Sequence, residues 1–277
     1  MGKIAIKEYD SSMALSVLPL NRCRHPSWVI ASRHFNRNPQ PLEIQGARIA
    51  HHSFFARMDL IKTPRTRERY FREYMKHVFL AGKWRGGTTY AERRSLRNDY
   101  LRFLRGWIHN ANSEEGAVLK GWVESRFGLP PVFHSGKIDS PECEEYMVYL
   151  GDRMRESARS NAIESQLDLV YEYVQYELAR RHPGTLFFQL YRGIRNIHDY
   201  LFLEETTDRR AVVRMNNLNS FSGRFEYAWE FGSHVFEANV PAAKIFFRSD
   251  LLPGILPEKE EESLVIGGDF DVIVREF

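Results

Sequence analysis

Apolar residues recur at helical spacing from about residue 50 to residue 182 of this chain. Thr63 and Pro64 suit a helix start, because the hydroxyl can cap a free backbone amide and proline is tolerated in the first turn. The apolar face of this predicted helix consists of Phe71, Met75, Val78 and Phe79, before Gly82. The same spacing predicts further helices over Tyr90–Asn110, from Ser113 to about Gly128, from Ser140 and Pro141 onward, and over Ile163–Leu178.

The pattern changes after Pro183 and Gly184, which break the last helix. The short apolar runs that follow predict strands at Thr185–Tyr191, Ala211–Met215, His234–Val240, Lys244–Phe247, Ser263–Ile266 and Phe270–Arg275, and a short helix around Arg224–Phe231. Because the helices precede the strands instead of alternating with them, we expect an α+β protein. A mainly helical region, residues 1–182, would pack on a mixed or antiparallel β-rich region, residues 183–277, as one integrated unit.

The composition limits the function classes. With 277 residues, 43% of them hydrophobic, the chain can bury the core of one or two domains. Its 39 basic and 36 acidic side chains nearly cancel, so the net charge of +3 gives no general affinity for polyanions. Cys23 and Cys143 lack the paired spacing of a zinc or redox motif, the histidines lack metal-ligand spacing, and we expect no metal site. With no signal peptide and no run of about 18 apolar residues, a cytoplasmic protein without a membrane span is expected.

One stretch is strongly basic despite the balanced total. Residues 62–105 hold 13 Lys and Arg against 4 Asp and Glu, a local excess of 13 − 4 = +9. This stretch could dock an acidic partner, or contact nucleic acid with Trp84, Tyr90 and Tyr100 interleaved. The simpler interpretation is two amphipathic helices with solvated arginines, and composition favours it. Since no nucleic-acid-binding signature accompanies the stretch, we expect no nucleic-acid partner.

The first candidate for chemistry is an arginine at the end of a predicted strand. Period-two counting places Arg192 on the same face as Leu190 and Phe188, so a charge extends an apolar face. A buried guanidinium needs an anionic partner, and its planar fork suits a diphosphate or a carboxylate. Gly193 would let a ligand approach the backbone closely. The alternative is a strand-end arginine that reaches solvent.

The second candidate is a pair of serines. Ser220 and Ser222 share one face of an extended segment, where two hydroxyls can orient a ribose or a catalytic carboxylate. Alternatively, Ser222 caps the short helix that follows. Nearby aromatic residues could supply a flat surface for a nicotinamide ring: Phe221, Phe225 or Trp229.

The third candidate is an acidic run before a predicted strand. Glu260 and Glu262 are two residues apart, so in an extended chain both carboxylates point to one side with Cα atoms about 6.6 Å apart, while Glu261 points away. One carboxylate could stabilise positive charge on a sugar carbon while the other handles an incoming nucleophile. The alternative is a solvated loop tip, which is the usual role of such a run.

Together, an Arg in YRG, a Ser-aromatic-Ser segment and a Glu-x-Glu before a strand resemble the R-S-E signature of arginine-directed mono-ADP-ribosyltransferases. Longer strings are more specific, and they resemble the dinitrogenase reductase ADP-ribosyltransferases of nitrogen-fixing bacteria. These strings are EGAVLKGWVESRFGLPPVFH (115–134), NAIESQLDLVYE (161–172), LYRG (190–193), VVRMNNLNSFS (212–222) and PGILPEKEEESLVIGGDFDV (253–272). The similarity runs from about His25 to the C-terminus, including the helical half.

The resemblance implies transfer of ADP-ribose from NAD to an arginine of dinitrogenase reductase, the nitrogenase iron protein. Nicotinamide is released and nitrogenase is switched off. Arg192, with Gly193 and Ser222 beside it, would bind NAD; Ser220 would help to position the catalytic carboxylate. Glu262 would engage the nicotinamide ribose, and Glu260 would hold the acceptor guanidinium. The resemblance also implies a PII-type nitrogen-signalling protein as a partner. Alternatives are another protein target, an NAD glycohydrolase, or a non-catalytic module that binds nucleic acid through the basic helices.

Overall fold

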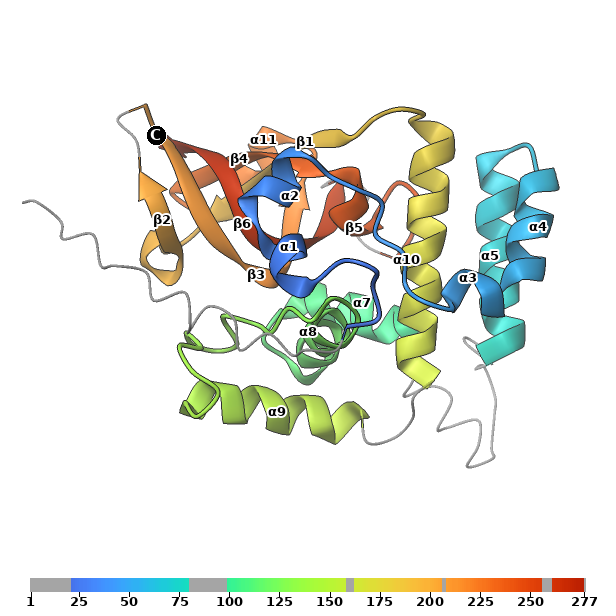
Figure 1. Cartoon of the computed structure of the whole chain (residues 1–277), viewed down its shortest axis with the longest axis horizontal. Helices are drawn as coiled ribbons and strands as arrows, with labels where there is room; N and C mark the ends of the chain where they lie inside the picture. The colour runs from blue at the N-terminus through green and yellow to red at the C-terminus, as the bar shows by residue number, and fades with distance from the viewer. Residues whose placement is uncertain (1–20, 80–98, 158–161, 206–207, 256–260, 277) are drawn as a thin grey trace, which may run out of the picture.

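The computed structural model describes residues 21–79, 99–157, 162–205, 208–255 and 261–276. In Figure 1 the β-sheet occupies one side of the molecule, α10 stands beside it, α4 and α5 lie outside α10, and α7, α8 and α9 lie beneath. This segregation of helices from strands confirms the predicted α+β class. The connection from α10 to β1 contains the predicted boundary at 182–183, and the division into those two regions stays a prediction.

The helical half surrounds one long central helix. Its described helices are α1 (Ser27–Ala31), α2 (Arg33–Arg37), α3 (Ala47–Ala50), α4 (His52–Leu60), α5 (Pro64–Phe79), α7 (Tyr100–His109), α8 (Glu114–Phe127), α9 (Glu144–Ser157) and α10 (Ala162–Arg181). Both predicted ends of α8 are confirmed. Ser113 Oγ accepts a hydrogen bond from the Gly116 amide at 3.2 Å, and Gly128 ends the helix in the left-handed conformation that glycine favours.

Other helix predictions were wrong in part. The helix predicted from Tyr90 begins only at Tyr100, because Asp99 is its N-cap and accepts from the Leu101 amide at 3.0 Å; residues 90–98 lie outside the described chain. The helix expected from Ser140 begins at Glu144. Val78, predicted on the buried face of α5, is 43% exposed. The short helices α1, α2 and α3 had no clear periodic signal.

The strands form one antiparallel sheet of six in the order β2-β3-β1-β4-β6-β5. They are β1 (Phe187–Ile194), β2 (Leu201–Glu205), β3 (Arg210–Ser222), β4 (His234–Pro241), β5 (Ile245–Arg248) and β6 (Glu262–Glu276), with α11 (Phe225–Trp229) between β3 and β4. Because β3 also pairs with β6, the four strands β3, β1, β4 and β6 close into a ring. The sequence did not predict β2.

A glycine pair explains why two predicted strands are one. Ser263–Ile266 and Phe270–Arg275 both belong to β6, which continues through Gly267 and Gly268. A Cβ on Gly267 would lie 1.7 Å from the Asn216 carbonyl oxygen, and Gly268 has φ of 126°. The pairing register between β3 and β6 shifts at this point. Gly267 therefore permits a close approach of β3 and β6, and the break implied by two separate predicted strands is absent.

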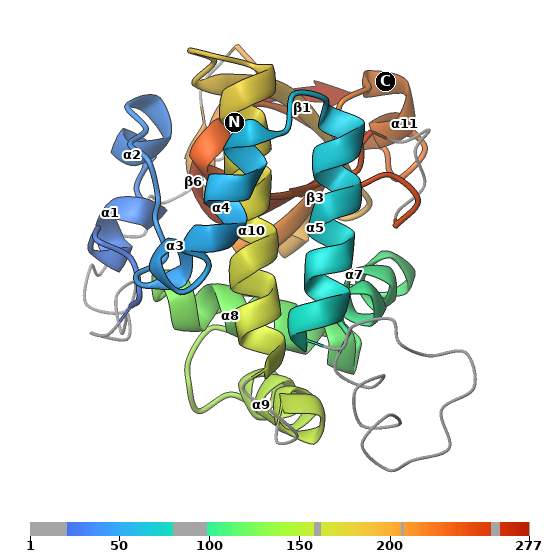
Figure 2. The ribbon, with the colours of Figure 1, turned by 90° about the vertical axis from the view of Figure 1, so that its right-hand side faces the viewer.

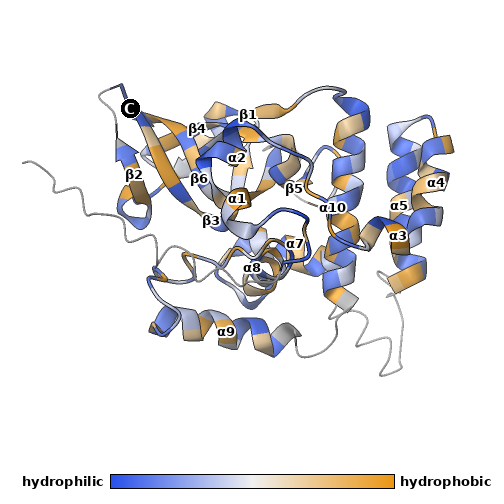
Figure 3. Ribbon diagram, viewed as in Figure 1, coloured by the Kyte–Doolittle hydropathy of each residue, from blue (hydrophilic) through white to orange (hydrophobic). Residues whose placement is uncertain are grey.

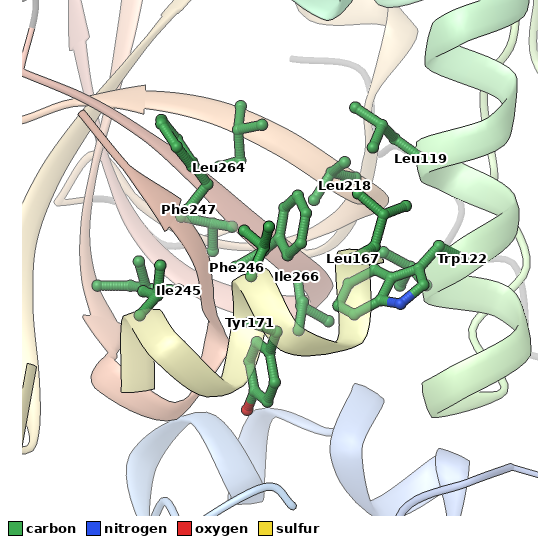
Figure 4. Close-up of a cluster of buried hydrophobic side chains, with 14 of the residues drawn as sticks. Leu119, Trp122, Leu167, Tyr171, Leu218, Ile245, Phe246, Phe247, Leu264 and Ile266 are labelled. Carbon is green, nitrogen blue, oxygen red and sulfur yellow. The ribbon is translucent and has the colours of Figure 1, made fainter. Parts of the chain in front are cut away.

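The core lies where the sheet meets α8 and α10. Figure 4 shows Trp122 from α8 among the buried side chains of this core, and its ring contacts the rings of Phe246 of β5 and Tyr171 of α10. The Trp122 and Phe246 ring centroids are 4.5 Å apart, and all three side chains are at most 1% exposed. Burial of such large rings stabilises the packing of the helical half against the sheet.

Buried ion pairs fix the outer helices. Arg67 of α5 donates from Nη2 to Glu177 Oε2 of α10 at 3.0 Å, and both side chains are at most 3% exposed. The remaining surfaces of α5 and α10 mix hydrophilic and hydrophobic residues, as Figure 3 shows. Tyr100 is only 2% exposed, so it cannot stack on a nucleic-acid base, contrary to that interpretation of the basic stretch. Trp84 and Tyr90 lie outside the described residues.

Candidate active site

A cleft of about 450 Å³ opens at the junction of the helical half and the sheet. Figure 2 shows α11 and α7, which both contribute lining residues, on the same side of the molecule. The helical half contributes the end of α7 and the segment near residue 132, and the β-rich half contributes β1, β3 and the first residue of β6. The predicted site residues among its lining are Arg192, Gly193, Ser220, Ser222 and Glu262.

Arg192 keeps its charge available to the cleft. Its Nε donates to the Tyr200 hydroxyl at 2.9 Å, and its Nη1 donates to the Ser220 carbonyl oxygen at 2.7 Å. Both acceptors are neutral, and among the described residues no carboxylate forms an ion pair with Arg192. The half-buried guanidinium is thus oriented by the protein and can attract an anionic ligand.

Close packing requires glycine at position 193. A Cβ at this position would lie 2.0 Å from the Ala228 carbonyl oxygen and 2.8 Å from Phe231 Cβ. The space beside its Cα is therefore filled by α11 and the residues after it, so a larger residue here would displace one wall of the cleft.

The two serines occupy the last residues of β3. Ser220 Oγ accepts a hydrogen bond from Trp107 Nε1 at 2.8 Å, and its carbonyl oxygen accepts from Arg192. Ser222 Oγ accepts from the Arg224 amide at 3.0 Å, at the entrance to α11, while Arg224 itself is the N-cap residue. Ser222 lines the cleft, and its predicted role in NAD binding stays a prediction. The alternative that Ser222 is the cap of the short helix was wrong, because its hydroxyl accepts from the amide of the N-cap residue Arg224 and not from an amide within the helix.

Glu262 is the first residue of β6 and is only 7% exposed. It pairs directly with Ser222, while Ser220 pairs with Leu264. Opposed residues of antiparallel strands project from the same face, so Glu262 and both serines share one face. Segments at 192, 220–222 and 262 thus converge on one cleft.

The acidic run differs from the extended chain that the sequence suggested. Glu261 has φ of 45°, a left-handed conformation that is uncommon for a non-glycine residue, and the strand begins only at Glu262. The Glu261 carboxylate pairs with Arg224 at 2.8 Å. The acidic run is therefore not a regular extended segment in which successive side chains point to opposite sides. Glu260 lies outside the described residues.

The sequence analysis missed the residues that join β3 to the helical half. Asn216 Nδ2 donates to the Phe133 carbonyl oxygen at 2.9 Å, and its Oδ1 accepts from the Val132 amide at 3.0 Å. Asn217 Nδ2 donates to the Lys120 and Leu129 carbonyl oxygens at 2.8 and 2.9 Å. The sequence pattern that could have indicated these contacts is the polar string NNLN inside an apolar strand. Asparagine is depleted in strands, so its presence there suggests that the side-chain amide has a partner.

The aromatic lining also differs from expectation. Phe225 and Trp229 stack on each other with ring centroids 5.7 Å apart and are not among the lining residues. Phe221 lines the cleft but is only 2% exposed. Phe231, which the sequence analysis did not single out, also lines the cleft and is 45% exposed.

A buried lysine supports the helical wall. Lys120 Nζ donates to Asn112 Oδ1 and to the Phe133 carbonyl oxygen at 3.0 Å each, and lies 3.1 Å from His134 Nδ1. Burial, with a further contribution from the positive charge of Arg192, lowers the pKa of Lys120 to about 7. Burial and then the Lys120 charge lower the pKa of His134.

The described part of the chain contains no group of three or more His, Cys, Asp or Glu side chains that could hold a metal ion. In those same residues no helix is long and apolar enough to cross a membrane.

An arginine, two serines and a glutamate, the residue types in which the sequence resembles the R-S-E signature, thus line one cleft of an antiparallel sheet. The family model of dinitrogenase reductase ADP-ribosyltransferases matches residues 20–274, and the chain belongs to that family. It is 38% identical over 250 residues to the NAD(+)--dinitrogen-reductase ADP-D-ribosyltransferase of Rhodospirillum rubrum, covering 88% of this chain and 90% of that relative. No solved structure matches this chain.

Proposed function

We propose that this chain transfers ADP-ribose from NAD to an arginine of dinitrogenase reductase, which releases nicotinamide and inactivates nitrogenase. The observation that carries the proposal is the convergence of Arg192, Ser220, Ser222 and Glu262 on one cleft, in a chain of this family. The cleft volume of about 450 Å³ lies within the range of small-molecule sites, about 300 to 1,000 Å³.

Arg192 binds the anionic part of the substrate. The protein orients this guanidinium with two neutral acceptors, so its charge is not compensated by a described carboxylate. A diphosphate offers the paired oxygens that suit such a planar fork. Binding there places the ribose toward the strand ends that carry Ser220 and Glu262.

Glu262 stabilises the transition state of glycosidic cleavage. The bond between the ribose C1′ and the nicotinamide nitrogen breaks, and the electron pair leaves with neutral nicotinamide. Positive charge develops on the ribose, and a buried, preorganised carboxylate stabilises it electrostatically. A guanidinium nitrogen of the acceptor then forms the new bond to C1′ and loses a proton.

Glu260 has the role of receiving that proton and holding the acceptor guanidinium in this proposal. We therefore expect Glu260→Gln to slow transfer to protein more than it slows hydrolysis of NAD. Both rates can be measured on one preparation, from labelled target protein and from free ADP-ribose. Equal losses in the two rates would remove the acceptor role from Glu260.

The decisive experiment is mass spectrometry of purified dinitrogenase reductase after incubation with this protein and NAD. One added ADP-ribose on an arginine supports the proposal. Free ADP-ribose alone would indicate an NAD glycohydrolase, and modification of other proteins only would indicate a different target. No nicotinamide release together with nucleic-acid binding that falls steeply with salt would indicate the non-catalytic alternative.

The family resemblance also supports a PII-type nitrogen-signalling protein as regulatory partner and a cytoplasmic location, where the target enzyme works. Co-purification of the two proteins, and the change in nicotinamide release when the PII-type protein is added, test that partner. Unchanged release at saturating PII-type protein would exclude it as an activator.

A further inference from the structure

We propose that Trp107, which belongs to the helical half, is a positioning residue for the catalytic cleft and acts through Ser220. Its indole N–H fixes the orientation of the Ser220 hydroxyl, so the β-rich half does not by itself complete the site. This inference rests on the proposed function, because its test reads the release of nicotinamide.

The donor direction of this contact is unambiguous. Trp107 Nε1 lies 2.8 Å from Ser220 Oγ, and the indole is 3% exposed, so water does not compete strongly for it. An indole nitrogen can only donate, whereas a hydroxyl both donates and accepts. Ser220 Oγ must therefore accept from Trp107, and its own hydrogen is directed to a different acceptor.

The contact leaves Ser220 with little freedom. Its carbonyl oxygen accepts from Arg192 Nη1 at 2.7 Å while its side chain accepts from Trp107. Ser220 and Glu262 line the same cleft on the same face of the sheet, two residue pairs apart along β3 and β6. With a donor on the helical side, the Ser220 hydrogen points away from that wall, toward the part of the cleft that holds the reacting groups.

Trp107 is itself held in place from behind. Lys120 Nζ lies 5.9 Å from the centroid of its ring, and that ammonium is fixed by Asn112, Phe133 and His134. Asn217 joins β3 to the carbonyl oxygen of the same lysine. The helix that carries the indole and the strand that carries the serine therefore share one rigid framework.

A two-way comparison of variants tests whether Trp107 works through Ser220. Trp107→Phe keeps an aromatic ring and removes the donor, so we expect about a three- to tenfold fall in kcat for nicotinamide release, the size of one neutral hydrogen bond. KM for NAD should change less than twofold, because Arg192 is intact. The double variant with Ser220→Ala should be no slower than Ser220→Ala alone.

Trp122→Phe is the matched control. Trp122 is also a buried indole of the helical half, and its Nε1 donates to Asp168 Oδ1 at 2.8 Å, away from the cleft. It should leave kcat unchanged. If Trp107→Phe fails to fold, benzothienylalanine at position 107 keeps the shape of the indole without the N–H, and should give the same kcat loss.

Several outcomes would overturn the inference. Trp107 would have a purely structural role if the double variant lost kcat by the product of the two single losses of Trp107→Phe and Ser220→Ala. The same conclusion would follow from an unchanged kcat in the benzothienylalanine variant, or from an equal loss of kcat in Trp122→Phe. A wild-type protein that releases no nicotinamide under any condition would instead refute the proposed function, and the inference with it.

Discussion

Two hollows on the described surface can be compared, and the larger of these two is not the candidate active site. The larger hollow, about 640 Å³, lies between α2 and strands β1, β3, β4 and β6, whereas the cleft has about 450 Å³. Arginines line both. In the larger hollow, Arg33 pairs with Glu204 and Asp271 at 2.7 Å each, and Arg37 pairs with the same aspartate at 2.7 Å.

The difference between the hollows is the compensation of charge. Asp271 and Glu204 already satisfy Arg33 and Arg37, so an anion entering there would have to displace carboxylates of the protein. Arg192 in the cleft donates only to a hydroxyl and a carbonyl oxygen among the described residues. An anionic ligand gains a full ionic interaction there. The balance of charge, and not the volume, is therefore our reason for proposing the cleft as the NAD-binding site.

The largest expected effect belongs to the carboxylate of the cleft. Glu262→Gln should lower the rate of nicotinamide release by about 10²- to 10³-fold, by analogy with the loss of one preorganised transition-state group. Glu237→Gln is the matched change in the larger hollow, where Glu237 pairs with Arg275. It should leave the rate unchanged. A comparable loss in both variants would contradict the distinction between the hollows.

The next largest effect separates Arg192, which forms no ion pair with a described residue, from Arg33, which pairs with carboxylates of the protein. Arg192→Gln should raise KM for NAD by about ten- to a hundredfold, since a hydrogen bond to a charged group contributes about 1.5 to 3 kcal/mol. Arg33→Gln, at the larger hollow, should leave KM as in the wild type. Steady-state kinetics with varied NAD measure both, and an increase in KM only for Arg33→Gln would reverse our assignment.

Buried lysines should make stability depend on pH. Burial lowers the pKa of both Lys120, whose ammonium contacts the Phe133 carbonyl oxygen, and Lys244, whose ammonium lies 4.9 Å from the ring centroid of Phe270, to about 7. Above that pH the unfolded state binds more protons than the folded state, so the free energy of unfolding should rise from about pH 7 to pH 9. The slope is at most about 1.4 kcal/mol per pH unit for each lysine.

Urea denaturation at pH 7, 8 and 9 measures this slope. Lys120→Met and Lys244→Met should each reduce it by up to half. An anion bound at Arg192 should raise the pKa of Lys120 only, because Lys120 senses the Arg192 charge and Lys244 senses Asp269. A wild-type stability that is flat or falls over this range would contradict the prediction.

The smallest effect concerns docking of the protein target on α5. Arg65 and Arg69 are exposed on one face of this helix, and neither forms an ion pair with a described residue. Reversing both charges should slow modification of the protein target severalfold at low salt, without changing NAD hydrolysis, because steering by surface charge is screened by salt. Arg22→Glu, an exposed arginine outside the basic stretch, is the control. Equal rates at every ionic strength would leave these residues as solvated surface.

The sequence predicted elements whose signals are local. Ser113 and Gly128 defined both ends of α8, because a hydroxyl cap and a left-handed glycine act within one turn of the helix. The sequence-based prediction failed where contacts between distant residues determine the secondary structure. The sequence predicted two strands on either side of Gly267 and Gly268, and only the carbonyl oxygen of Asn216 beside Gly267 shows why glycine stands within one continuous β6. The strand β2 was missed because its pairing with β3 is its main support.

The candidate site shows the same division. Arg192, Ser220 and Glu262 could be proposed from short patterns and from the family resemblance. Trp107 could not, since it lies 113 residues from Ser220 and its position fits an apolar helix stripe. Only the packing of α7 against the strand ends turns its indole N–H into a part of the cleft.

The sequence by itself determined the α+β class and the chemical groups, since periodicity and residue type are written along the chain. The tertiary structure decided which groups meet, which arginine keeps an uncompensated charge, and which tryptophan reaches the serine. The physical reason is that burial, ion pairing and hydrogen bonding depend on distances between residues far apart in sequence, which no local pattern specifies.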